Sequence, residues 1–79
     1  MKKYNIQLST IQDVQNFVRD LPAYGGEADL ESGRYVVDAK SIMGIFSLDL
    51  QSPITLILRE DNAPGEAALL EKIKPFVLQ

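Results

Sequence analysis

The chain of 79 residues contains no cysteine, no histidine and no tryptophan. The lack of cysteine excludes disulfide bonds, thiolate nucleophiles and thiolate metal ligands. The lack of histidine removes the commonest general base near neutral pH and the commonest ligand of transition metals. Catalysis would have to rest on carboxylates, hydroxyls and lysines, and no spacing in the sequence assembles these into a site. We therefore expect a protein that is not an enzyme and that holds neither a metal nor a cofactor.

Long apolar runs and a concentration of positive charge are missing as well. No run approaches the roughly 18–20 residues that a bilayer crossing needs, and residues 1–5 show no secretory signal. The net charge is −3, whereas nucleic-acid binding calls for a basic face. We expect a cytoplasmic protein that binds neither membrane nor nucleic acid. With no repeat or linker in the sequence, residues 1–79 are expected to form one domain.

Apolar periodicity predicts secondary structure in the order β-α-β-β-α-β-α. Alternating apolar residues predict strands, and apolar residues three or four positions apart predict helices. Tyr24-Gly25-Gly26 indicates a flexible turn, Ser32-Gly33 a tight hairpin, and Pro75 an early end of the last helix. The predicted strands cover residues 3–8, 27–31, 34–38 and 54–58. The first two predicted helices begin after Thr10 and Ser41, and the last begins near Pro64, which fits the first turn of a helix.

This order favours an α+β fold of two layers, a mostly antiparallel sheet with helices on one face. The first helix should face the core with Ile11, Val14, Phe17, Val18 and Leu21, and the last with Ala67, Leu70, Ile73 and Val77, flanked by Leu69 and Phe76. The other face of the sheet should be solvated. Val36, Thr55 and Ile57 are expected there, as a modest apolar surface for weak self-association.

Residues 40–48, Lys-Ser-Ile-Met-Gly-Ile-Phe-Ser-Leu, form the segment that folding alone explains least. Ser41 precedes an apolar run in the way that a helix N-cap does. On a helix, the apolar residues of the segment cover a wider arc than one core-facing stripe requires. Both sides of this arc cannot meet the same core, so we expect one side to be exposed.

The two sides of the arc have different expected roles. Ile45 and Leu48 lie on the side that we assign to the core. Ile42, Met43 and Phe46 lie on the other side, where exposed apolar residues suggest a surface for docking a protein partner. Lys40 adds a positive charge beside this surface.

The same segment closely resembles the regulatory-serine segment of HPr, the small carrier of the bacterial sugar phosphotransferase system. The order of elements and the spacing from Leu30 to Ser41 are also similar to HPr. The resemblance implies an open-faced β-sandwich with a four-stranded antiparallel sheet in the order 1-4-2-3 and three helices on one face. It also implies that Ser41 is phosphorylated by an HPr-type serine kinase/phosphorylase, and that a transcriptional regulator of carbon use is a possible partner.

The sequence departs from HPr at the phosphocarrier loop. Thr10 falls roughly where the family has its histidine, and Gln12 where it has an arginine. A hydroxyl cannot replace imidazole as a rapidly reversible phosphoryl carrier. The chain therefore resembles the HPr-like regulatory paralogues, which lack the histidine and retain the serine. Residual phosphotransfer through Thr10 or Asp13 is one alternative, and an unmodified structural adaptor is another.

Each of these features also has a purely structural interpretation. Ser41 can be only a helix N-cap, and Thr10 with Asp13 resembles a capping box. Ser47 fits a polar residue of a last helical turn, and Gly44 a position of close packing. Residues 60–62, Glu-Asp-Asn, match no calcium-binding spacing and are better explained as a solvated acidic loop.

Overall fold

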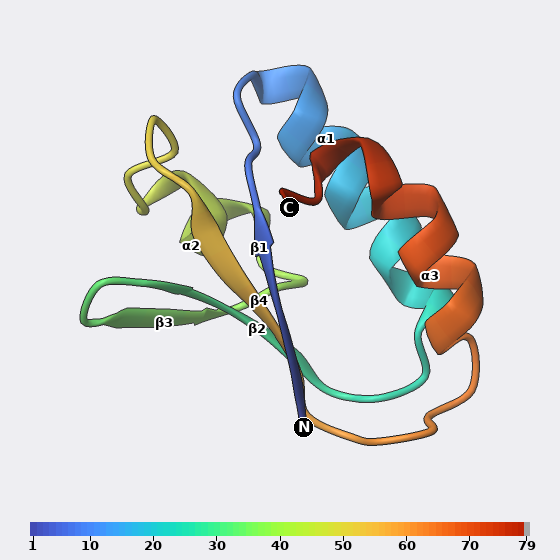
Figure 1. Cartoon of the computed structure of the whole chain (residues 1–79). Helices are drawn as coiled ribbons and strands as arrows, with labels where there is room; N and C mark the ends of the chain where they lie inside the picture. Colours follow the sequence, from blue (N-terminus) through green and yellow to red (C-terminus); the bar gives the residue numbers. More distant parts are fainter. Residues whose placement is uncertain (79) are drawn as a thin grey trace.

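The computed structural model describes residues 1–78 and has the two predicted layers (Figure 1). The four-stranded antiparallel sheet has the order β1-β4-β2-β3, which confirms the predicted topology. Helices α1 and α3 lie side by side over one face of the sheet, and α2 packs near β3 (Figure 1). The elements are β1 (Lys2–Ile6), α1 (Ile11–Asp20), β2 (Ala28–Ser32), β3 (Tyr35–Asp38), α2 (Ile42–Phe46), β4 (Ile54–Leu58) and α3 (Glu66–Ile73), with short 3-10 turns at Leu21–Ala23 and Lys74–Phe76.

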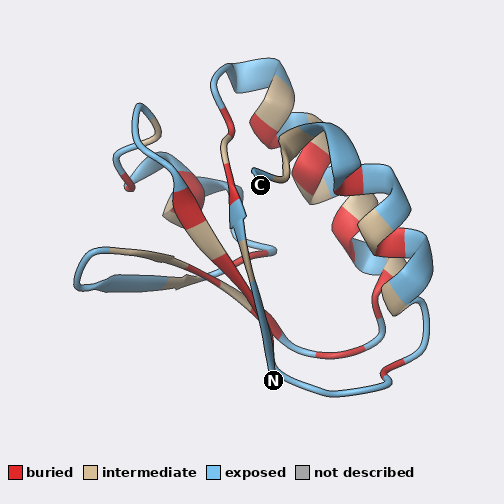
Figure 2. Ribbon diagram, viewed as in Figure 1, coloured by how far each residue is buried: buried red, intermediate tan, exposed pale blue. Residues whose placement is uncertain are grey.

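The sheet register explains the alternating pattern of the strands. Leu30 of β2 lies opposite Val37 of β3 and Leu56 of β4, so these residues share the face that the helices cover. The core is built from this face and from the inner sides of the helices (Figure 2). It contains Ile6, Leu8, Val14, Phe17, Leu21, Tyr24, Ala28, Leu30, Ala39, Ile45, Leu48, Ile54, Leu56, Leu58, Ala63, Leu69 and Ile73.

The opposite face of the sheet is less open than expected. Val36 is 52% exposed, whereas Ile57 is only 8% exposed. Ile57 belongs to an interior strand and has Lys3 and Asp29 as neighbours across the sheet. Asp29 is also paired with Arg59 at 2.5 Å. Because Ile57 is largely covered within the chain, an apolar surface of Val36, Thr55 and Ile57 does not form.

The inner face of α1 differs from the prediction at its first residue. Val14 and Phe17 are fully buried, but Ile11 is 66% exposed. Ile11 lies in the first turn of the helix, which projects beyond the sheet (Figure 1). The helical period was correct, and only its first apolar position fell outside the core.

The inner face of α3 is rotated relative to the prediction. Leu69 and Ile73, four positions apart, are fully buried, whereas Ala67 is exposed. The helix also starts later than expected: Pro64 precedes it, and Gly65 is the N-cap with φ +83°. Pro75 ends the α-helix early, as predicted, because its ring cannot continue the helical hydrogen bonds. Among residues 1–78, no helix has both the length and the apolar character needed to cross a membrane.

Candidate functional site

Ser41 is the N-cap of α2, as predicted. Its Oγ accepts a hydrogen bond from the backbone N–H of Gly44 at 3.1 Å, and its carbonyl oxygen accepts one from Ile45 at 2.9 Å. Asp38 stabilises the turn before Ser41. Its side-chain Oδ1 accepts a hydrogen bond from the N–H of Lys40 at 2.9 Å, and its carbonyl oxygen accepts one from the N–H of Ser41 at 3.0 Å. Ser41 and Lys40 are both exposed. The serine is therefore accessible and has a defined backbone position.

The five-residue helix α2 has one buried and one exposed apolar side. Ile45 is fully buried, and Leu48 just beyond the helix is 7% exposed. The other apolar residues of the helix remain in contact with solvent: Met43 is 78% exposed, Phe46 42% and Ile42 36%. The predicted division of the arc is thus observed. We call Ile42, Met43 and Phe46 the α2 apolar patch.

Gly44 allows α2 to sit close to β3. A Cβ atom at this position would lie 3.2 Å from the Cβ of Val37 and 3.2 Å from the Oγ of Ser41, tighter than nine in ten such contacts. Ser47 closes the last turn, because its hydroxyl donates to the carbonyl oxygen of Gly44 at 2.5 Å. Both residues therefore have the structural roles predicted for them, and they hold α2 against the sheet with the α2 apolar patch exposed.

The region that would correspond to a carrier site lies at the start of α1. Thr10 is the N-cap, and its Oγ1 accepts from the N–H of Asp13 at 3.0 Å. Asp13 accepts in turn from the N–H of Ser9 at 3.1 Å, one residue before the N-cap, so only the Thr10 half of the predicted capping box is present. Gln12 donates to the side chain of Asn16 at 2.9 Å. Thr10 and Asp13 thus bind backbone donors of the helix start, and α1 contacts α2.

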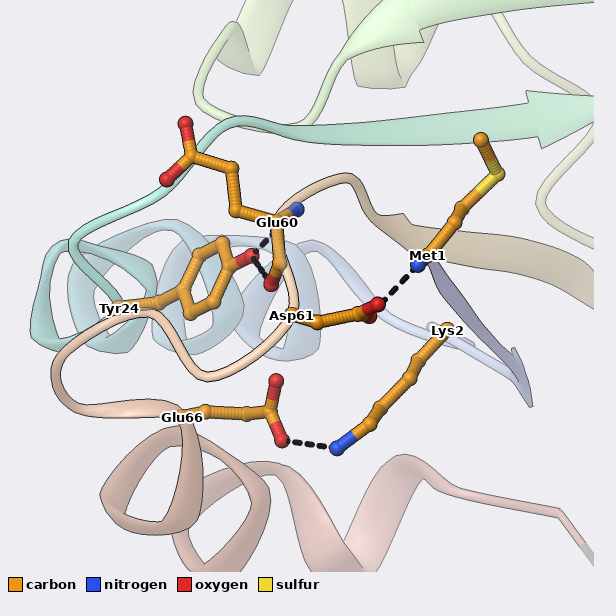
Figure 3. A network of polar contacts seen from close by, with 6 residues as sticks. All are labelled: Met1, Lys2, Tyr24, Glu60, Asp61 and Glu66. Atoms are coloured by element: carbon orange, nitrogen blue, oxygen red, sulfur yellow. Dashed lines mark hydrogen bonds and ion pairs between the residues drawn. The ribbon is translucent and has the colours of Figure 1, made fainter.

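A polar cluster on the other side of the molecule from α2 (Figure 1 and Figure 3) was not predicted from the sequence. Tyr24, expected in a flexible turn, is only 1% exposed. Its hydroxyl donates to the carbonyl oxygen of Glu60 at 2.8 Å and accepts from the N–H of Glu60 at 3.1 Å. Gly25 donates to the carbonyl oxygen of Pro64 at 2.7 Å. The turn is therefore fixed by contacts with residues distant in sequence.

Two positions around this cluster require glycine, because the neighbouring atoms leave no room for a Cβ atom. A Cβ at Gly26 would be 2.7 Å from the hydroxyl of Tyr24, and a Cβ at Gly65 would be 1.6 Å from the carbonyl oxygen of Ala23. We call Tyr24, Gly25, Glu60 and Gly65 the Tyr24 clasp. Its sequence signal was a glycine pair after a tyrosine, which does not by itself distinguish a flexible turn from a packed one.

Two ion pairs lie beside the Tyr24 clasp (Figure 3). They join the start of the chain and β1 to Asp61, in the loop before α3, and to Glu66, the first residue of α3, whose side chain is only 13% exposed. The terminal amine of Met1 is 2.6 Å from Asp61, and this hydrogen bond and charge lower the pKa of the Asp61 carboxyl. The Nζ of Lys2 is 2.6 Å from Glu66, whose hydrogen bond raises the pKa of Lys2. Glu60, Asp61 and Asn62 are exposed in this loop. Among residues 1–78, no group of three or more carboxylates is arranged to hold a metal ion.

Comparison with known proteins identifies the fold. No protein-family model matches the sequence, and no curated protein matches it. Among solved structures, the chain is similar to HPr-C-His from Thermoanaerobacter tengcongensis, with a TM-score of 0.74 and 22% sequence identity. The match covers 95% of this chain and 89% of the other. The chain therefore has an HPr-like fold, in agreement with the sheet order and the placement of the helices.

Proposed function

We propose that this chain is a protein-binding domain related to the sugar phosphotransferase system, without phosphohistidine carrier activity. The observation that carries the proposal is the division of α2. Ile45 anchors the helix in the core, while the α2 apolar patch stays exposed on a helix held in place by Ser41 and Gly44. Exposed apolar side chains on a well-fixed element are typical of a surface that binds another protein. The HPr-like fold supports a partner from that system.

We further propose that phosphorylation of Ser41 by an HPr-type serine kinase/phosphorylase regulates this binding. Ser41 is exposed and directly precedes the patch, so a phosphoryl group there adds almost two negative charges beside Met43. Lys40 supplies a neighbouring positive charge. The buried side of α2 is not involved, so the modification changes the charge of the surface while its shape is kept. A transcriptional regulator of carbon use is the corresponding partner.

The chemistry at the start of α1 supports the proposed loss of the carrier role. The chain has no histidine, and the polar side chains of Thr10 and Asp13 cap the helix. Residual phosphotransfer is tested by incubation with the first enzyme of the phosphotransferase system and labelled phosphoenolpyruvate. We expect no label on the protein. Label on Thr10 or Asp13 would replace the binding proposal with a carrier function.

The Ser41 proposal is tested with an HPr-type kinase, ATP and intact-protein mass spectrometry. We expect the mass of one phosphoryl group on the unmodified sequence and on Ser47→Ala, and none on Ser41→Ala. Ser47 is the matched control because it is a serine in the same segment, at the other end of α2. Phosphate on Ser47, or none on any residue, would contradict the proposal and favour an unmodified adaptor.

The patch is tested with the same kinase as the binding partner. Met43→Asp should lower kcat/KM for phosphorylation of Ser41 by about tenfold, the effect of losing roughly 1.4 kcal/mol of binding. Ala68→Asp adds the same charge at an exposed position of α3 and should leave kcat/KM unchanged. Equal phosphorylation of the two variants would mean that the kinase does not use the α2 apolar patch.

A further inference from the structure

The two edges of the sheet differ in how far the chain covers them. β1 forms one edge, and the end of the chain pairs with it: Gln7 donates to the carbonyl oxygen of Phe76 at 2.9 Å, and Leu78 to that of Asn5 at 2.8 Å. β3 forms the other edge. Within residues 1–78, β3 pairs only with β2. The outer side of β3 therefore faces away from the sheet with no strand beside it (Figure 1).

The register identifies the backbone groups on this free edge. The N–H of Ala39 donates to the carbonyl oxygen of Ala28 at 3.1 Å. Hydrogen-bonded pairs in an antiparallel ladder recur every second residue, so Val37 also bonds to β2. Val36 and Asp38 then direct their backbone groups outward. The carbonyl oxygen of Asp38 accepts from Ser41, which leaves Val36 with both a donor and an acceptor on the free edge.

The side chains of β3 are unusual for a free edge. Such edges are commonly protected by charged residues or proline, because unpaired backbone groups invite another strand. Here Tyr35 is 72% exposed and Val36 is 52% exposed. Arg34 and Asp38 lie on either side of them, both exposed. A short apolar edge between two opposite charges can pair with a partner strand.

We propose that a second copy of this chain pairs with β3, antiparallel and with Val36 opposite Val36 of the copy. This register places Arg34 opposite Asp38 of the second copy, and the two-fold symmetry repeats that pair. Opposite charges that face each other across strands are stabilising. The two Val36 residues exchange N–H···O bonds through the groups that their own sheet leaves free.

The neighbouring symmetric registers are less favourable. Centring the pair on Asp38 brings two carboxylates together, and centring it on Val37 brings Arg34 opposite Lys40. Like charges opposite one another are destabilising. Centring it on Tyr35 places Arg34 opposite Val36 and leaves Asp38 without a cationic partner. Arg34, in the turn before β3, and Asp38, at the end of β3, therefore select the Val36 register.

The dimer also covers apolar surface on the helical side of the sheet. In the Val36 register, Tyr35 lies opposite Val37 of the second copy. α2 packs on Val37, where a Cβ at Gly44 would be 3.2 Å from the Cβ of Val37. Tyr35 therefore approaches α2 of the second copy. Since one short strand from each chain is involved, the interface belongs to the small and weak class. This inference is independent of the proposed function.

Sedimentation of the full chain over a range of concentrations tests the dimer. We expect reversible dimerisation, and Arg34→Asp should raise the dissociation constant by about tenfold, because symmetry introduces the repulsion with Asp38 twice. Lys72→Asp makes the same charge change at an exposed site on α3 and should leave the constant unchanged.

Amide hydrogen exchange on the unmodified chain gives a second test that needs no variant. Protection of the Val36 N–H should increase with protein concentration, whereas that of Val37, already bonded to β2, should not. A chain that stays monomeric at millimolar concentration would overturn the proposal. So would a dimer that Arg34→Asp leaves intact or whose formation does not protect Val36.

Discussion

The Tyr24 clasp and the α2 apolar patch use similar residue types in opposite ways. In the clasp, an aromatic side chain is buried and its hydroxyl is bonded to both backbone groups of Glu60. In the patch, Met43 and Phe46 remain exposed on a helix whose other side is buried. Both regions have a glycine that permits close packing, at Gly65 and at Gly44. The difference lies in whether the large side chains are turned toward the protein or toward solvent.

This difference separates stability from binding. Burying a Met or Phe side chain stabilises a fold by about 1.5–3 kcal/mol, a large amount for a small domain with a stability of roughly 5–15 kcal/mol. In the clasp, burial of the Tyr24 ring contributes this free energy to folding. The exposed Met43 side chain of α2 contributes little to folding, so the free energy of its burial can instead stabilise a complex with a partner. Substitutions should therefore affect stability in the clasp and binding in the patch.

The largest effect in the Tyr24 clasp is expected at Gly65. Gly65→Ala places a Cβ within 1.6 Å of the carbonyl oxygen of Ala23, at a φ of +83°, so the backbone must move. We expect a loss of more than about 3 kcal/mol in the free energy of unfolding. Gly33→Ala is the matched control, since φ there is +59° but nothing lies near the added Cβ. It should cost only about 1–2 kcal/mol. Urea unfolding of both variants measures the difference, and equal losses would show that the contact with Ala23 relaxes easily.

A smaller effect is expected from removing one hydroxyl of the clasp. Tyr24→Phe leaves the ring in the core but deprives both backbone groups of Glu60 of a partner, which should cost about 1–3 kcal/mol. Tyr35→Phe makes the same chemical change on a side chain that is 72% exposed and should stay within about 0.5 kcal/mol. If the two variants unfold at the same urea concentration, water replaces the hydroxyl and the clasp is not rigid.

The fold could be predicted because the strands and helices follow local rules. The alternation in β1, the apolar run of β4, the hairpin before β3 and the serine before α2 are all visible within a few neighbouring residues, and so is the exposure of Met43. The HPr resemblance then supplied the strand order. The tight turn itself lies one residue later than expected, at Gly33 and Arg34.

The clasp could not be predicted because it depends on contacts between distant residues. Tyr24 and Glu60 are 36 positions apart, and only the closed fold shows that the turn at Gly25 is packed. The rotation of α3 has a similar origin. Its start is set by the left-handed φ of Gly65, beside Ala23, and this moves Leu69 into the core in place of Ala67. The roles of Ser41, Lys40 and the α2 apolar patch in binding remain predictions.

Ser41 links the two kinds of region, because its side chain stabilises the helix that carries the patch. Ser41→Ala removes the acceptor for the N–H of Gly44 and should cost about 1 kcal/mol, the usual value for an N-cap. Ser41→Asp keeps an acceptor at this position and should remain within about 0.5 kcal/mol of the original stability. Thermal unfolding compares the two variants. A larger loss in Ser41→Asp than in Ser41→Ala would mean that negative charge at this site disrupts α2, which contradicts a switch that preserves shape.

The smallest change in stability is expected in the patch itself, at Met43. Because this side chain is 78% exposed, Met43→Asp should alter the free energy of unfolding by no more than about 0.5 kcal/mol. Ile45→Asp, two residues further on, places a charge at a fully buried position and should prevent folding, because an unpaired charge in a core is strongly unfavourable. Circular dichroism and urea unfolding distinguish these outcomes. If Met43→Asp also unfolds the domain, then Met43 supports the core and the contrast between the patch and the clasp fails; if it is neutral, any loss of binding in this variant arises at the surface.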